Sequence, residues 1–299
     1  MTTIRTRSCA GKRGSMEFHS IQSETREHGV LLLTLDDPST LNSLGEPLTS
    51  ELLSEIDRFA ADPDLRCLVL TGAGRSFSSG ANVRGFARSI DERDAAAEAG
   101  DDPARQPWPT LDPMFTAEET REAVGPALVH RLHNLQKPSI AAVNGFAYGL
   151  GCGVALSCDI RVAGESARFS EAFVRNGLIP ADGSAWQLPK LIGTARTLWM
   201  QYTGEQIDGR EAERIGLVNV TVADDELIDT AIGMATQLAT GPVFAMGMIK
   251  QLVTRGFDQT LPEHLALASR AQEIARTTDD HREGVSAFVN KRKPEFKGR

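Results

Sequence analysis

Two glycine-containing segments place backbone amides where a side chain would obstruct a bound group. They run from Phe77 to Val83 and from Asn144 to Gly153. The second segment follows an apolar stretch typical of a strand and leads into an apolar, helix-compatible run from Val154 to Leu156. Free amides and the positive end of a helix are therefore expected to converge near Leu150. This arrangement predicts a site that binds a phosphate or stabilises an oxyanion.

Several other kinds of site are disfavoured by the spacing of the reactive residues. The G-x-G-x-x-G dinucleotide fingerprint is absent, and no glycine-rich loop ends in the Gly-Lys-Ser/Thr of a P-loop. The four cysteines form no CxxC pair and do not cluster with histidines, and a surface helix explains His130 and His133. No metal site is therefore predicted. Ser184 has no His-Asp pattern nearby, so a serine hydrolase is not supported.

Short apolar runs that alternate with helical patterns predict the elements that position these segments. The expected strands are Val30 to Leu35, Cys67 to Thr71, Ser139 to Val143 and Asp159 to Ala163. A helix is expected between the first two strands, because Leu48, Leu52, Ile56 and Phe59 share one face at helical spacing. Strands that alternate with helices indicate an α/β fold.

The last third of the sequence is predicted to be mainly helical. Asp224 is expected to cap a helix that Gly241 and Pro242 terminate. A second helix is expected to begin near Pro242 and end at Gly256, and a last one to run from about Asp280 to Lys291.

Composition divides the chain into three predicted parts. Residues 1–20 form a leader that is expected to be disordered, with a weak organelle-targeting signal as the alternative. Residues 21–200 form the core, and residues 201–299 form the C-terminal helical region. Within the core, residues 88–126 are an acidic, proline-rich excursion. This excursion is either a lid over a site or a solvated insertion.

Charge and hydropathy limit the partners. Lys and Arg number 32 against 40 Asp and Glu, giving a formal net charge of -8, so nothing favours a nucleic-acid partner. No apolar run approaches the length of a membrane span, and the first 16 residues have no apolar region of the kind found in secretory signals. The expected location is cytoplasmic, with an organelle matrix as the alternative because the leader is basic.

The glycine segments and their neighbours together resemble the successive motifs of the enoyl-CoA hydratase/isomerase (crotonase) superfamily, in the family's order and spacing. The matching segments are Leu41-Asn42-Ser43-Leu44, Phe77 to Val83, Lys137 to Gly145, Gly149 to Gly153 and Cys158-Asp159-Ile160-Arg161. The tail from Arg282 to Phe288, followed by Lys291-Arg292, is also similar to the family. It is most similar to the branch of phenylacetate-pathway ring-epoxide isomerases.

The resemblance implies a spiral core of β-β-α units with C-terminal helices used in trimerisation, as a homotrimer or a dimer of trimers. It also implies an acyl-CoA substrate and no separate cofactor. In the family two backbone amides bind the thioester oxygen, and the matching residues are Ala81 and Leu150. One such donor typically lowers the barrier by about 3 kcal/mol, because it stabilises the enolate that forms on that oxygen.

Further residues match positions that contact coenzyme A in the family. The positions that line the adenine and pantetheine path in relatives correspond to Thr40, Leu41, Ser79, Ala81, Asn82 and Val83. At one of them, Asn82 replaces the more usual Asp. Phe288 and Lys291 match residues that reach a coenzyme A bound to the same or a neighbouring subunit. An ammonium there pairs with phosphate as a point charge.

The sequence departs from the family's hydratases at both catalytic acids. Hydratases of the family supply two Glu, one to activate water and one to deliver a proton. Gly153 and Phe173 stand at the two matching positions. Hydration by the usual mechanism is therefore disfavoured.

Asp182 is the candidate that remains, because isomerases of this superfamily often use an Asp in this stretch to move a proton along the acyl chain. The Asp of the ring-epoxide branch matches Ala181, one position earlier, so Asp182 either faces the pocket or only forms a turn before Gly183. Glu171, two residues before Phe173, is expected to face solvent or form an intersubunit salt bridge.

These expectations favour an isomerase that shifts a double bond or rearranges an unsaturated acyl-CoA through an oxyanion-stabilised enolate. Two alternatives remain open. One is an enoyl-CoA hydratase-like lyase or hydrolase that works without the two Glu, and the other is a catalytically inactive acyl-CoA-binding protein.

Overall fold

Two sheets of strands form the body of the molecule in the computed structural model, which describes residues 18–82 and 124–299. The larger sheet has the order β1-β2-β3-β5-β7-β10 and the smaller one the order β4-β6-β8-β9. The strands of the larger sheet are β1 (Ile21–Thr25), β2 (Val30–Leu35), β3 (Cys67–Gly72), β5 (Ser139–Val143), β7 (Ile160–Gly164) and β10 (Val220–Val222). The strands of the smaller sheet are β4 (Ser76–Ser78), β6 (Phe146–Tyr148), β8 (Arg168–Ser170) and β9 (Ile207–Asp208).

Successive strand pairs alternate between the two sheets. β3, β5 and β7 are parallel neighbours in the larger sheet, and the strand that follows each of them, β4, β6 and β8, is a parallel neighbour in the smaller one. The helix α5 (Leu150–Ser157) follows the β5-β6 pair. This repetition confirms the α/β fold and the spiral of β-β-α units expected from the resemblance.

The central strands of the larger sheet, β2, β3, β5 and β7, are buried on both faces, which explains why they read as nearly continuous apolar runs. Val30 and Leu32 of β2 point to one face and pack in a cluster with Ala231 and Ala235 of α9 (Leu227–Ala239). The alternate residues of β2 point to the opposite face, which packs against α1 (Leu48–Ala61). The predicted strands and the first helix are confirmed to within a residue or two at their ends.

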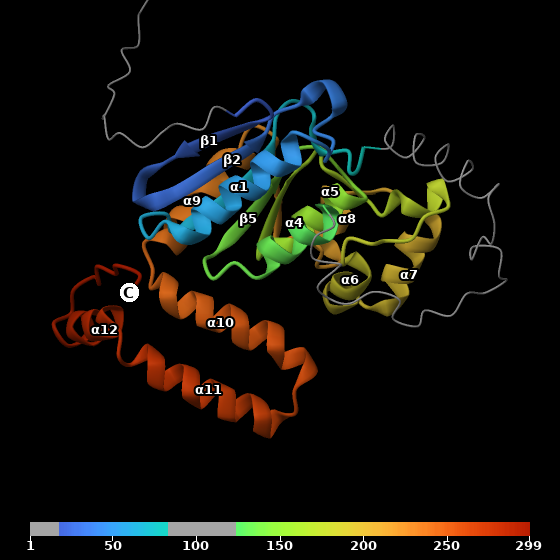
Figure 1. Cartoon of the computed structure of the whole chain (residues 1–299). Coiled ribbons are helices and arrows are strands. Elements are labelled where there is room, and N and C mark those ends of the chain that lie inside the picture. The colour runs from blue at the N-terminus through green and yellow to red at the C-terminus, as the bar shows by residue number, and fades with distance from the viewer. Residues whose placement is uncertain (1–17, 83–123) are drawn as a thin grey trace, which may run out of the picture.

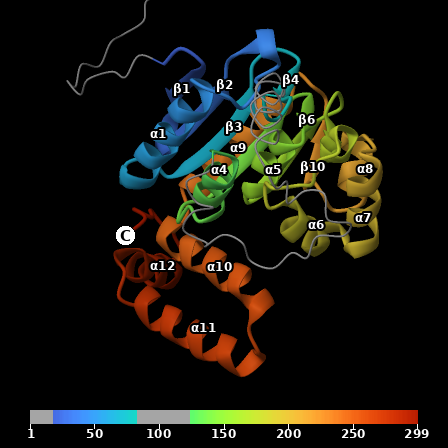
Figure 2. The ribbon, with the colours of Figure 1, turned by 45° about the vertical axis from the view of Figure 1, so that its right-hand side comes forward.

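The other helices pack against α1, α5, the smaller sheet or one another, or extend from the body. They are α4 (Val124–His133), α6 (Ser184–Ile192), α7 (Thr194–Thr203), α8 (Gly209–Arg214), α10 (Val243–Arg255), α11 (Leu261–Ala275) and α12 (Asp279–Val289). Figures 1 and 2 show α10, α11 and α12 as an arm that leaves the body, whereas α9 lies against the larger sheet. The predicted C-terminal helices are therefore confirmed, with α11 as an additional one.

Helix α9 begins later than expected, so the prediction that Asp224 caps it is wrong. Its N-cap residue is Glu226, which makes no side-chain cap hydrogen bond. The Asp224 carboxylate instead accepts a hydrogen bond of 2.9 Å from the Ser166 amide, in the turn between β7 and β8. The Ser166 amide, from a distant segment, thus binds the carboxylate that the local sequence predicts as the helix cap.

Three of the predicted boundaries can be compared with the structure. Residues 1–17 of the leader lie outside the described residues, while the amides of His19 and Ser20 donate hydrogen bonds to the Glu51 carboxylate. Most of the 88–126 excursion also lies outside them, but residues 124–126 belong to α4. Helix α7 crosses the predicted boundary at residue 200.

Within the described ranges, no helix taken singly has both the length and the apolar character to cross a membrane. The segments Leu227–Ala239 and Val243–Asp258 meet those criteria only when taken together, and they are bent by 102° at the break between them.

Candidate active site

The two glycine segments meet at a close backbone contact. Gly80 has a φ of +92°, a conformation that glycine adopts without strain. A Cβ at this position would lie 2.5 Å from the carbonyl oxygen of Tyr148 and 3.4 Å from the amide nitrogen of Leu150. The turn that presents Ala81 therefore packs directly against the beginning of α5.

The amides of Ala81 and Leu150 are both available at this contact. The first hydrogen bond of α5 runs from the Gly153 amide to the Gly149 carbonyl, at 3.0 Å, so the Leu150 amide has no acceptor within the helix. Neither amide donates a backbone hydrogen bond to any described residue. The structure thus brings together the two donors that the sequence predicts for an oxyanion hole.

A loop before α1 holds the Ala81 segment in place. The Leu44 amide donates to the Gly80 carbonyl at 2.8 Å, and the Ser79 amide donates to the Leu41 carbonyl at 2.9 Å. The Ser79 hydroxyl donates to the Thr40 carbonyl, also at 2.9 Å. Thr40, Leu41 and Ser79, three of the predicted coenzyme A contacts, are therefore adjacent.

Two more predicted contacts belong to this segment. The Asn82 side chain lies 3.3 Å from where a Cβ on Gly45 would stand, so it packs beside the same loop. Val83 lies outside the described residues.

Asn42 anchors the loop, a role that was not predicted from the sequence. Its buried side-chain amide donates to the carbonyls of Ala73 and Ser76, at 3.0 and 2.7 Å, and its Oδ1 accepts from the Asp37 amide at 2.9 Å. Its carbonyl accepts from the Ser78 hydroxyl at 2.7 Å. Asn42 thereby ties the loop to the segment from Ala73 to Ser78, which leads into the glycine turn.

Asp182 faces the interior, whereas its neighbour Ala181 is exposed. The Asp182 side chain is 2% exposed, and its Oδ1 accepts a hydrogen bond of 3.1 Å from the Ser184 amide. A Cβ added at Gly153 would lie 2.7 Å from the Asp182 Cγ and closer still to Oδ2. The carboxyl group therefore occupies the space that a side chain at position 153 would fill, one turn of α5 beyond Leu150.

Helix α6 sets Asp182 against α5. Gly183, with a φ of +78°, forms the turn before α6, and the Gln187 amide group donates to the Ser157 hydroxyl at 3.3 Å. Ser157 in turn donates to the Gly153 carbonyl at 2.7 Å. These bonds fix the two helices side by side. Oδ2 of Asp182 has no hydrogen-bond partner among the described residues.

Gly153→Ala is expected to lower activity by displacing the Asp182 carboxyl. The new methyl group cannot remain 2.7 Å from Cγ, and a displacement of about 1 Å can cost about 100-fold in rate. Turnover of an acyl-CoA substrate by the purified variant measures the effect. Gly233→Ala is the matched control, because it lies within helix α9 and a Cβ there meets nothing within 4 Å among the described residues. Equal activity in both variants would contradict this placement of Asp182.

Glu171 is buried, and the expectation that it faces solvent or an intersubunit salt bridge is wrong. Its exposure is 0%, and its Oε2 accepts a hydrogen bond of 2.5 Å from the Ser184 hydroxyl. Glu171 directly follows β8, whose last two residues, Phe169 and Ser170, are buried as well, so no alternation in the sequence marks it. Desolvation, with a smaller contribution from the negative charge of Asp182, raises the pKa of Glu171 to about 8.

This raised pKa predicts how stability depends on pH. The fold favours the protonated carboxyl, so its contribution to stability is complete below the ordinary value of 4.5 and is lost as the pH rises through about 8. The Tm of the wild type should therefore fall more than that of Glu171→Gln between about pH 5 and about pH 9. Thermal denaturation across this range measures it. Parallel Tm curves for the two proteins would contradict the prediction.

Phe173, at the second position where hydratases carry Glu, is an apolar wall of the site. Its ring carbons would lie 3.4 to 3.7 Å from a Cβ on Gly149. Tyr148, the last residue of β6, donates its hydroxyl to the Gln206 side chain. Its ring centroid lies 5.2 Å from that of Phe146, which suits a packing role.

The remaining predicted contacts, Phe288 and Lys291, are not part of this cluster within one chain. Phe288 belongs to α12 and is 86% exposed, and Lys291 follows that helix with a φ of +52°. In Figures 1 and 2, α12 lies at the end of the C-terminal arm, away from α5. Contact with a coenzyme A on a neighbouring subunit stays a prediction.

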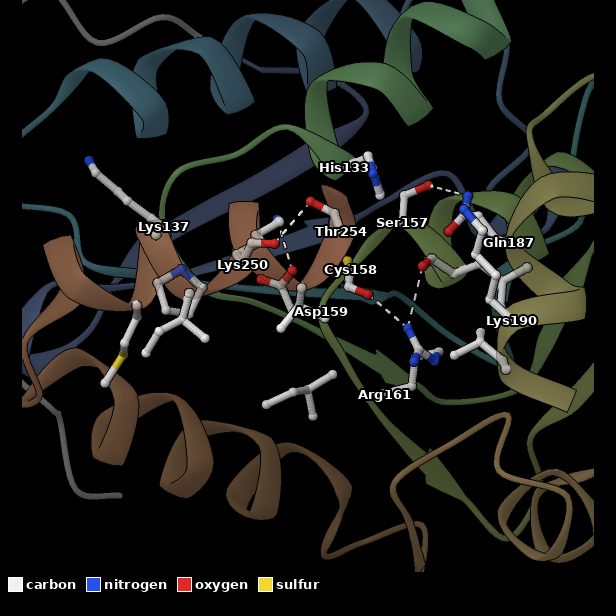
Figure 3. Close-up of a pocket in the computed structure, with 18 of the residues that line it drawn as sticks. His133, Lys137, Ser157, Cys158, Asp159, Arg161, Gln187, Lys190, Lys250 and Thr254 are labelled. Carbon is white, nitrogen blue, oxygen red and sulfur yellow. Dashed lines mark hydrogen bonds and ion pairs between the residues drawn. The ribbon is translucent and has the colours of Figure 1, made fainter. Parts of the chain in front are cut away.

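A separate hollow of about 430 Å³ lies at the other end of α5. Figure 3 shows Lys250 of α10 beside Asp159, with an ion pair of 2.8 Å. It also shows Arg161 donating to the Cys158 carbonyl. Ala81, Leu150 and Asp182 do not line this hollow, so it is distinct from the cluster described above. No group of three or more His, Cys, Asp or Glu in the described ranges is arranged to hold a metal ion.

Comparison of the sequence with known proteins agrees with this geometry. The chain matches the family model described as enoyl-CoA hydratase/isomerase over residues 25–106 and 113–299. It is 38% identical to the 1,2-epoxyphenylacetyl-CoA isomerase of Escherichia coli (strain K12), over 91% of this chain and 97% of the relative. It is 34% identical to the 2,3-dehydroadipyl-CoA hydratase of the same organism, over 92% of this chain and 98% of that protein.

Comparison with solved structures gives the same result. The crystal structure of an enoyl-CoA hydratase from Bacillus anthracis matches with a TM-score of 0.78 and 30% sequence identity. The match covers 94% of this chain and 100% of that one. The first relative is consistent with the ring-epoxide isomerase branch suggested by the sequence. The chain belongs to the enoyl-CoA hydratase/isomerase family.

Proposed function

We propose that the protein is an acyl-CoA isomerase that moves a double bond, or rearranges an unsaturated acyl group, through an enolate. The observation that carries this proposal is the position of Asp182. Its carboxyl group fills the space beside Gly153, and Oδ2 has no partner among the described residues. A single base there can remove a proton from one carbon and return it to another. The coenzyme A thioester is the substrate, and no further cofactor is invoked.

The amides of Ala81 and Leu150 supply the stabilisation that this chemistry needs. Removing a proton next to the thioester moves negative charge onto its oxygen, and two preorganised donors favour that charged state over the starting carbonyl. Burial raises the pKa of Asp182, so its ionised form is a stronger base than an exposed aspartate. Both features favour formation of the enolate.

The wall of the site favours isomerisation over the usual hydration. Gly153 and Phe173 provide neither of the two expected carboxyl groups, and the Phe173 ring lies close to Gly149 at the start of α5. An apolar wall gives no hydrogen bond to orient an attacking water. The relative with 38% identity is also an isomerase.

Hydration by an unusual pair of acids is the second candidate, because Glu171 adds a second buried carboxyl group beside Asp182. One acid and one base in the same pocket meet the basic requirement for adding water to an enoyl thioester. The 2,3-dehydroadipyl-CoA hydratase among the relatives is consistent with this reaction.

Incubation with a panel of trans-2- and 3-enoyl-CoA esters in deuterated water distinguishes these functions, with products followed by mass spectrometry and NMR. The isomerase predicts a moved double bond or deuterium uptake without added water, both lost in Asp182→Asn. Added water would favour the hydratase. Thioesters that bind equally well to the wild type and Asp182→Asn, yet stay unaltered, would favour a binding protein.

The exposed apolar side chains of the C-terminal arm support the proposed assembly as a homotrimer or a dimer of trimers. Large apolar residues lie exposed along α10, α11 and α12, among them Ile249, Val253, Leu261, Leu265, Val285 and Phe288. Such a surface is typical of a protein–protein interface. Light scattering coupled to gel filtration should give three or six times the mass of the 32.3 kDa chain, and a monomer would contradict the proposal.

A further inference from the structure

Helices α4 and α6 both pack against α5, and they contact each other at two successive levels. At the first level, next to Asp182, Cγ1 of Val129 lies 3.4 Å from where a Cβ on Gly183 would stand. At the second level the rings of His133 and Trp186 meet edge to face, with their centroids 5.3 Å apart. Val129 and His133 are one turn apart on the same face of α4. This line of contact therefore leads from Asp182 to His133 and Trp186, which border the hollow of about 430 Å³.

Helix α5 runs in the same direction, from the oxyanion donors to the hollow. Its first residue, Leu150, carries one of the two free amides, and the Asp182 carboxyl group fills the space beside Gly153. Its last residue, Ser157, borders the hollow and accepts a hydrogen bond of 3.3 Å from Gln187, which also borders it (Figure 3). Ser157 lies about 6 Å beyond Gly153 along the helix axis. The hollow therefore begins about one helical turn beyond the catalytic carboxyl group.

Val129 stands at the first level of this path and is not part of the tightly packed core. It is half-buried and Gly183 is exposed, whereas Leu128 and Leu132 on the same helix are buried. Gly183 has no side chain, so the methyl groups of Val129 narrow the space between α4 and α6 next to Asp182. The size of residue 129 therefore controls how much room lies between the base and the hollow.

The hollow itself suits an apolar chain. Its charged groups are already engaged: Lys250 pairs with Asp159, Lys137 and Arg161 donate to backbone carbonyls, and Lys190 lies over the Trp186 ring. The apolar residues that line it include Leu156, Leu191, Ile249, Val253 and Phe257. Methylene groups that enter such a cavity leave water for apolar contacts, which favours their binding.

We propose that Val129 is a specificity-determining residue that limits the length of the acyl group, so that the substrate is a short acyl-CoA. This inference rests on the proposed isomerase function. In that reaction the thioester oxygen lies at the amides of Ala81 and Leu150, and the reacting carbons lie at Asp182. The remaining carbons continue in the same direction and meet the Val129 side chain before they reach the hollow.

The test compares kcat/KM for trans-3-hexenoyl-, trans-3-octenoyl- and trans-3-decenoyl-CoA in the wild type, Val129→Ala and Val129→Leu. In the wild type the value should fall by about tenfold or more from the hexenoyl to the decenoyl ester, because a methylene group that does not fit a pocket carries at least that penalty. Val129→Ala should raise the decenoyl-to-hexenoyl ratio by about tenfold or more, since each methylene group that becomes buried is worth about fourfold. Val129→Leu should lower the ratio by a similar factor.

Val220→Ala is the matched control, because Val220 is a half-buried valine of β10 that packs on the face of the larger sheet covered by α9. Its ratio should equal that of the wild type. The ratio does not depend on the fraction of enzyme that is folded, so a destabilised variant still reports specificity. A wild type that converts the decenoyl ester as well as the hexenoyl ester, or a ratio unchanged in both Val129 variants, would overturn the role of Val129 alone. A wild type that isomerises none of the three esters would overturn the proposed function as well.

Discussion

Asp182→Asn is expected to lower kcat for double-bond movement by about 10²–10⁴-fold, the usual range for loss of a positioned general base. The Asn side chain is the same size as Asp and is still able to accept the hydrogen bond from the Ser184 amide. It also fills the same space beside Gly153, but it cannot remove a proton. The expected result is thus a large loss of turnover with substrate affinity nearly unchanged.

Steady-state kinetics with a 3-enoyl-CoA, together with calorimetric binding of a saturated acyl-CoA, separates these two effects. An unchanged kcat in Asp182→Asn would assign the proton transfer to another group. A loss of binding as large as the loss of turnover would show that the variant disturbs the pocket and not only the base. Asp224→Asn is a suitable control, because the Asp224 carboxylate also accepts a hydrogen bond from a backbone amide, that of Ser166.

Gly80→Ala is expected to lower kcat by about 10²–10³-fold, the typical effect of losing one oxyanion donor. Gly80 has a φ of +92°, and a methyl group there would lie 2.5 Å from the Tyr148 carbonyl. The backbone must shift to relieve this contact, and the shift separates the amides of Ala81 and Leu150. The measurement is kcat with the same 3-enoyl-CoA.

Gly74→Ala provides a matched control for Gly80→Ala. Gly74 also has a positive φ, of +71°, so alanine meets a similar backbone strain of about 1 kcal/mol. Within the described part of the chain, its new methyl group would meet only Pro38, at an ordinary 3.4 Å. The control should therefore lose some stability and little activity. Comparable activity in the two variants would contradict the role of the Gly80 turn.

The strands of the larger sheet and the helix α1 could be predicted from the sequence because their patterns are strong. β2, β3 and β5 are buried on both faces, which gives short apolar runs that local sequence identifies. The smaller sheet could not be predicted in this way. Its strands, such as β6 (Phe146–Tyr148), are two or three residues long, too short for a period of two to be recognised.

Among the helices, α11 was not predicted, although a local signal marks its start. Thr260 and Glu263 form a capping box at its N-terminus, a pattern that is readable from sequence. The cap assigned to Asp224 could not be judged locally, because its actual donor, Ser166, is 58 residues away in the chain.

The candidate site was likewise predictable from the sequence only in part. The amides of Ala81 and Leu150 could be located from the glycine spacing, because a turn and a helix N-terminus are local features. The orientation of Asp182 depends on where α6 lies against Gly153, and the burial of Glu171 depends on the path of β8, so both required the structure. The sequence shows that both usual acids are absent but not that two other carboxyl groups are brought together.

Deuterium wash-in at the α-carbon of a 3-enoyl-CoA tests the central claim most directly, because it reports enolate formation by Asp182 within the hole formed by Ala81 and Leu150. The wild type should incorporate deuterium at the α-carbon and yield the 2-enoyl isomer without added water. Asp182→Asn and Gly80→Ala should each suppress that incorporation by about 100-fold or more. Incorporation at the wild-type rate in Asp182→Asn, or none in a wild type that binds the thioester, would contradict the account.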